Sequence, residues 1–125
     1  MNDTARSAYL DASIATASPA RLLVMLCDRL VLDVTRGLEA ELTGDPAEAN
    51  RHLLHAQEIV LELRSSLRVD AFEGGPALDG LYEFLHAELV RANVRKDADL
   101  ARGCLALAEQ LRDTWREAAM QAAVA

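Results

Sequence analysis

The sequence has few residues that break helices and few that build β-sheets. Its 125 residues include six glycines, three prolines and only 4% aromatic side chains. A β-sandwich or barrel needs many short strands separated by turns at intervals of about 8–12 residues, so this composition excludes both architectures. Alanine and leucine, which favour helices, make up about a third of the chain. We therefore predict an all-α protein whose length suits a single hydrophobic core.

Basic residues are also scarce. The chain has 13 Lys and Arg against 20 Asp and Glu, a formal net charge of −7, and no basic run. Nucleic-acid binding is therefore not expected, because neutralising phosphates needs clustered Lys and Arg. No apolar stretch approaches the roughly 18 residues of a membrane-spanning helix, and residues 1–9 lack the apolar core of a signal peptide. We expect a cytoplasmic protein that binds neither nucleic acid nor membranes.

The two cysteines fit a reducing compartment. Cys27 and Cys104 each lie in an apolar stretch with helical spacing. A buried, reduced thiol is the simpler interpretation of each, and a redox pair is the alternative.

Prolines mark the expected helix starts. Ser18 precedes Pro19 and Asp45 precedes Pro46, so each pair supplies an N-cap followed by a first-turn proline. The third proline follows two glycines, and Asp97 is a further N-cap candidate. These starts predict helices over residues 19–42, 46–70, 76–95 and 98–120.

Apolar residues along these helices recur at intervals of three and four, as in helical bundles. The second expected helix carries Ala49, Leu53, Ala56, Val60, Leu63 and Leu67. The first repeats by fours, which drifts about 40° per step around the helix: Leu22, Leu26, Leu30, Val34, Leu38 and Leu42. We assign both stripes to the core. Short connections favour antiparallel neighbours. The prediction is an antiparallel four-helix bundle over residues 18–120, with a short N-terminal segment (1–17) packing on it and a tail over 121–125.

Some apolar residues lie outside these core-facing stripes or widen them. Leu54 and Leu61 project roughly 130° from the centre of their stripe, and Leu81 and Phe84 widen the stripe of the third helix to one side. Surplus apolar surface on neighbouring helices can form a groove for a partner. A wide core that covers these side chains is the alternative.

Catalytic and metal-binding patterns are weak. Glu83 and His86 have the spacing of a ferritin-like carboxylate site, but the second such pair that these sites need is absent. His52 and His55 could also hold a metal, yet they flank the apolar stripe and we expect them to face solvent. We therefore expect no enzyme activity, metal or other cofactor. A ferritin-like metal-binding bundle and a self-associating structural subunit are the alternatives.

Four local strings, in order and covering nearly the whole chain, resemble the flagellin export chaperone family, FliS. They begin with Tyr9, Ile14, Thr16-Ala17-Ser18-Pro19 and Leu22-Leu23-Val24-Met25-Leu26. They continue with Ile59-Val60-Leu61-Glu62-Leu63-Arg64-Ser65-Ser66-Leu67, then Leu78-Asp79-Gly80-Leu81-Tyr82-Glu83-Phe84 with Ala92-Asn93, then Leu111-Arg112-Asp113-Thr114-Trp115. Cys27 departs from the pattern, since the family usually has a tyrosine there, and Arg6 stands where an aliphatic residue is common.

This resemblance implies a cytoplasmic chaperone that binds the C-terminal segment of newly made flagellin and blocks its polymerisation before export. It also implies that the export gate of the flagellar type III secretion apparatus reads the complex, and that no nucleotide or metal takes part. A disordered segment that folds into grooves on a helical bundle needs a large contact area. The expected flagellin contacts are Tyr9 and Ile14, which the resemblance implies, and the surplus apolar residues Leu54, Leu61, Leu81 and Phe84.

Overall fold

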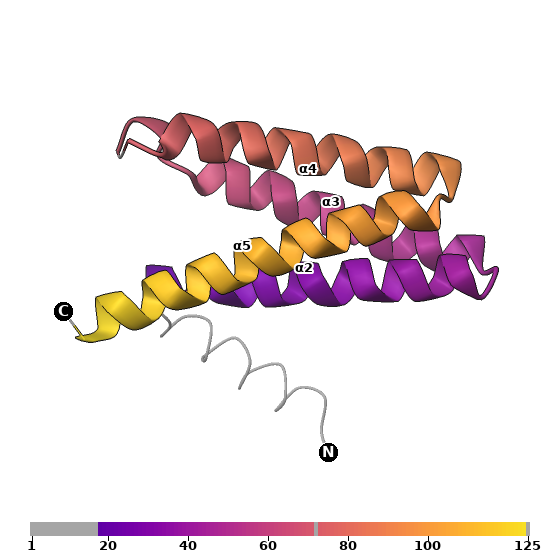
Figure 1. Cartoon of the computed structure of the whole chain (residues 1–125), viewed down its shortest axis with the longest axis horizontal. Coiled ribbons are helices and arrows are strands. Elements are labelled where there is room, and N and C mark those ends of the chain that lie inside the picture. The colour runs from indigo at the N-terminus through magenta and orange to yellow at the C-terminus, as the bar shows by residue number, and fades with distance from the viewer. Residues whose placement is uncertain (1–17, 72, 125) are drawn as a thin grey trace, which may run out of the picture.

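The computed structural model of the chain describes residues 18–71 and 73–124. Within them, four long helices follow one another, joined by short turns and one 3-10 turn. They are α2 (Pro19–Leu42), α3 (Pro46–Ser66), η1 (Val69–Ala71), α4 (Gly75–Arg95) and α5 (Ala98–Val124). Successive helices run in opposite directions (Figure 1), so the predicted antiparallel four-helix bundle is confirmed. The expected N-terminal segment, residues 1–17, lies outside the described residues, and its packing stays a prediction.

The helix starts follow the capping signals of the sequence. The Ser18 hydroxyl accepts a hydrogen bond from the backbone N–H of Arg21 at 3.2 Å. The Asp45 carboxylate accepts one from the N–H of Glu48 at 3.2 Å, and Asp97 caps the start of α5 in the same way. Each of these bonds satisfies a backbone donor that has no partner inside the helix.

Two helix ends differ from the prediction. α3 ends at Ser66 rather than at residue 70, because the chain turns at η1 and folds back over the start of α4. A Cβ added at Gly75 would lie 2.0 Å from the carbonyl oxygen of Val69, so this contact needs a glycine. α5 continues to Val124, past the predicted end at residue 120.

The core lies at the centre of the ring of helices. α2 packs most extensively on α3 and α5, and α4 closes the ring between them. Most of the predicted stripe residues are buried there, together with Tyr82, whose hydroxyl accepts a hydrogen bond from Trp115 Nε1 at 3.2 Å. Cys27 and Cys104 are buried free thiols, as expected. Burial raises the pKa of each to about 12, which keeps both thiols neutral.

α2 and α3 pack closely at Gly37, in the last third of α2. A Cβ added at Gly37 would lie 2.7 Å from Cδ2 of Leu53, closer than two carbon atoms can pack. The pair is therefore tightly packed at Gly37.

We predict that Gly37→Ala lowers the free energy of unfolding by about 1–3 kcal/mol, because the new methyl group displaces Leu53 from a packed core. Urea denaturation measures this change. Gly80→Ala is the matched control, since Gly80 is helical with open space around it. That variant should gain about 0.5–1 kcal/mol from helix propensity. A gain of stability at both positions would show that the helices are not closely packed at Gly37.

Candidate functional site: a groove between α2 and α3

A groove with mostly apolar walls lies between the first half of α2 and the last turns of α3. Its volume is about 810 Å³, within the range of sites that hold a ligand or part of a partner. Its α3 side includes Glu62 and Ser66, and Met25 on the α2 side is 37% exposed. The residues that line it from α2 are Pro19, Leu22, Leu23, Met25, Leu26 and Arg29.

The groove exists because α2 carries more apolar surface than the bundle can cover. Residues 22–26 are five consecutive apolar residues, and successive residues of a helix point about 100° apart. No single core-facing stripe can bury all five. The assignment of Leu22 to the core stripe was therefore wrong, since it is only half-buried and lines the groove. Leu42 was also wrongly assigned to this stripe, because it is 57% exposed at the end of α2. Leu26 lines the groove as well, but it packs against the core as expected. The unbroken apolar run was the signal in the sequence that could have identified the groove.

Beyond Arg29 the walls between the two helices become polar. Arg29 lines both the apolar groove and a neighbouring hollow of about 380 Å³ that contains Asp33 and His55. Asp33 is fully buried, and its carboxylate accepts a hydrogen bond from Arg29 Nε at 3.1 Å. The other carboxylate oxygen contacts Nδ1 of His55, which comes from α3. The buried carboxylate thus holds a side chain from each helix.

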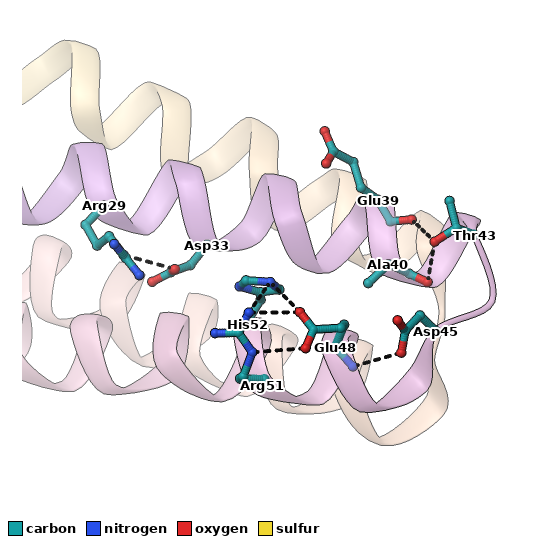
Figure 2. Close-up of polar contacts among 9 residues, drawn as sticks. All are labelled: Arg29, Asp33, Glu39, Ala40, Thr43, Asp45, Glu48, Arg51 and His52. Atoms are coloured by element: carbon teal, nitrogen blue, oxygen red, sulfur yellow. Dashed lines mark hydrogen bonds and ion pairs between the residues drawn. The ribbon is translucent and has the colours of Figure 1, made fainter.

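A second polar cluster follows on α3, and Figure 2 shows it beside the Arg29–Asp33 pair. Arg51 donates to both carboxylate oxygens of Glu48, at 3.2 and 2.8 Å, and His52 Nε2 lies 3.3 Å from the same carboxylate. Hydrogen bonding from Arg51 lowers the pKa of Glu48. His52 is buried, so the expectation that it faces solvent was wrong. His52 lies against α2, where it borders the same hollow as Arg36, Glu39 and Ala40.

The predicted partner residues occupy different faces. Leu54, 44% exposed, lines the polar hollow between α2 and α3, and Leu61 on the same helix is 49% exposed. Leu81 is half-buried and packs against the core. Phe84 is 57% exposed and lines a separate groove of about 160 Å³ between α4 and α5. The structure therefore does not bring Leu54 and Phe84 into one groove. Tyr9 and Ile14 lie outside the described residues.

Three of the residues weighed as metal ligands, Glu83, His52 and His55, have other contacts. Glu83 forms an ion pair across α3 and α4 with Nη2 of Arg64, at 3.5 Å. Among residues 18–71 and 73–124, no three His, Cys, Asp or Glu side chains are grouped as metal ligands. None of the helices in this part of the chain is long and apolar enough to cross a membrane.

Comparison with known families gives a match along almost the whole chain. A family model described as "Flagellar protein FliS" matches residues 1–122. The chain belongs to the FliS family. The resemblance identified from the sequence is thereby confirmed, and with it a place among flagellar secretion chaperones.

Individual FliS relatives match along most of their length. The flagellar secretion chaperone FliS of Bacillus subtilis is 27% identical over 112 residues, which are 90% of this chain and 84% of that protein. The flagellar secretion chaperone FliS of Vibrio cholerae is 25% identical over 109 residues, 85% of this chain and 79% of that protein. A solved structure described as "Crystal structure of flagellar chaperone from bacteria" has the same fold, with a TM-score of 0.75 at 19% identity. That match covers 94% of this chain and 97% of the other.

For this FliS-family protein we predict that Asp33→Ala lowers the free energy of unfolding by about 2 kcal/mol, since two hydrogen-bonding side chains lose a buried carboxylate. Denaturation in urea tests this. Asp28→Ala is the matched control, because Asp28 pairs with Arg116 at 2.8 Å where both side chains are about half exposed. That variant should change stability by no more than about 0.5 kcal/mol. Equal losses in the two variants would contradict a structural role for Asp33.

Proposed function

We propose that this FliS-family chaperone binds the C-terminal segment of flagellin in the cytoplasm and prevents its premature polymerisation. In this proposal it also supports flagellin export by the flagellar type III secretion system, whose export gate reads the complex. The observation that carries the proposal is the apolar groove between α2 and α3, on a member of a family of secretion chaperones.

The groove has the properties that a helix-forming apolar segment requires. Its floor consists of leucines that are half-buried, so their outer surfaces stay in contact with water until a partner covers them. Covering apolar surface is favourable by about 25 cal/mol per Å². A segment that is disordered when free loses conformational entropy on binding, so it needs a long contact surface. A groove open at one end of the bundle offers such a surface.

We place further contacts of flagellin on α3 and α4. Leu54 borders the polar continuation of the groove, and Leu61 is exposed on the same helix. Leu81 and Phe84 lie on α4, away from the α2–α3 groove. A bound segment that contacts both sets must be long enough to pass from one face of the bundle to the next.

We predict that Met25→Asp, Leu61→Asp and Phe84→Asp each weaken binding of the flagellin C-terminal segment at least about tenfold, or 1–2 kcal/mol, as expected for apolar anchors. Isothermal titration calorimetry with a synthetic peptide of that segment measures the affinity. The fold should survive, because all three side chains are exposed. Leu81→Asp is less informative, since Leu81 packs against the core.

Val94→Asp is the matched control for this series. Val94 is an exposed apolar residue near the C-terminal end of α4, outside the two grooves. Its replacement should leave the affinity unchanged within about twofold, as expected for a residue outside the interface. Wild-type affinity of Met25→Asp would place the binding site elsewhere, and wild-type protein that does not bind the peptide would refute the proposed function.

We also propose that residues 1–17 cover apolar surface of the bundle in the free protein and rearrange when flagellin binds. The segment joins α2 at Ser18, next to Pro19 at the end of the groove, so its residues start within reach of the apolar floor. Tyr9 and Ile14 are large apolar residues in a segment otherwise rich in small ones. Tyrosine combines a large contact area with a polar tip, which suits a contact that forms and releases.

Tyr9→Ala should therefore change the affinity for the flagellin peptide measurably while it shifts the melting temperature by no more than a few degrees. Hydrogen exchange should show altered protection of residues 5–15 when the complex forms. Exchange at the rate of a disordered chain in both states, together with unchanged affinity of Tyr9→Ala, would show that the segment takes no part in binding.

A further inference from the structure

The two sides of the α2–α3 groove carry opposite charges. Arg29 stands on the α2 side and Glu62 on the α3 side, and both line the same apolar groove. We propose that this pair sets the direction in which an amphipathic helix of the bound segment lies. The helix presents an acidic side chain to Arg29 and a basic side chain to Glu62. This inference rests on the proposed binding of flagellin and adds a sequence requirement to it.

A hydrogen bond to Asp33 fixes the side chain of Arg29. Its Nε donates to Asp33 at 3.1 Å, and Asp33 is itself fixed by burial and by its contact with His55. Both Nη groups of Arg29, on a side chain that is 48% exposed and lines the groove, therefore remain available to donate hydrogen bonds to a bound segment. An anchored guanidinium loses little conformational entropy when it binds a carboxylate, so it is suited to recognise an acidic side chain.

The opposite side of the groove is acidic. Glu62 is exposed, and no Lys, Arg or His of the described residues lies within 4.0 Å of its carboxylate. Glu58 stands one helical turn earlier on the same side of α3 and likewise has no ion-pair partner in that part of the chain. A Lys or Arg of the bound helix would supply the missing positive charge.

Opposite charges on the two sides distinguish the two directions of a bound helix. A helix whose apolar face lies on the floor places one flank beside α2 and the other beside α3. Reversing the helix exchanges its flanks, so its acidic side chain would then meet Glu62 and its basic one Arg29. Charges that flank the apolar seam of a coiled coil fix partner and orientation in the same way. Each such pair is weak by itself, so its effect is on orientation more than on affinity.

The test uses a synthetic peptide of the flagellin C-terminal segment and titration calorimetry. Glu62→Arg should weaken binding of the unmodified peptide about fivefold at low salt, and less at high salt because exposed charges are screened. Glu117→Arg is the matched control, because it makes the same charge change on the exposed surface of α5. It should change the affinity by less than twofold. Replacing the Lys and Arg residues of the peptide by Glu, one at a time, should reveal one position that restores binding to Glu62→Arg.

A second experiment measures the direction in which the peptide lies in the groove. It uses a nitroxide spin label attached to one end of the peptide or to the other. In wild-type protein only one of the two labelled peptides should broaden the methyl resonance of Met25, which lines the groove. In Glu62→Arg both should broaden it. Equal broadening in wild type, unchanged affinity of Glu62→Arg, or a charge scan without a rescuing position would overturn the inference and leave flagellin binding intact. Failure of wild-type protein to bind the peptide would instead refute the proposed function.

Discussion

The close approach of α2 to α3 at Gly37 is the constraint on which the rest of the molecule depends. Because no side chain separates the helices there, Leu53 packs directly against α2. Toward the N-terminal end of α2, the same two helices border the apolar groove. There the apolar run at residues 22–26 is only partly covered, although Leu23 and Leu26 pack against the core.

Much of the bundle could be predicted because its signals are local. Ser18 and Asp45 cap their helices as expected, since an N-cap depends on residues only three positions away. The buried stripe of α3 also followed from spacing alone. The groove could not be predicted in this way, because it depends on how two helices lie relative to each other, and the spacing within one helix does not give that arrangement. The spacing of apolar residues in α3 also predicted that His52 faces solvent. This was wrong because His52 is buried by its neighbours on α2, which the spacing within α3 does not reveal.

The partner residues show the same limit. Helical periodicity identified Leu54, Leu61 and Phe84 as surplus to the core, and all three are exposed. Periodicity within one helix does not show which neighbouring helix a side chain faces, so it could not show that Phe84 faces a groove with α5. Leu81 is half-buried because the edge of a core-facing stripe still packs against the core. Family membership supports a chaperone role, whereas the location of its binding surface has to come from the arrangement of the helices.

Methionine methyl resonances provide the most direct test of flagellin binding in the α2–α3 groove. The chain has three methionines, and Met25 lines the groove while Met120 is exposed near the C-terminal end of α5. With methyl-labelled protein, saturation by the flagellin C-terminal peptide should shift the Met25 resonance, assigned through Met25→Leu, more than that of Met120. An unchanged Met25 resonance at saturation, with binding demonstrated by calorimetry, would contradict the account.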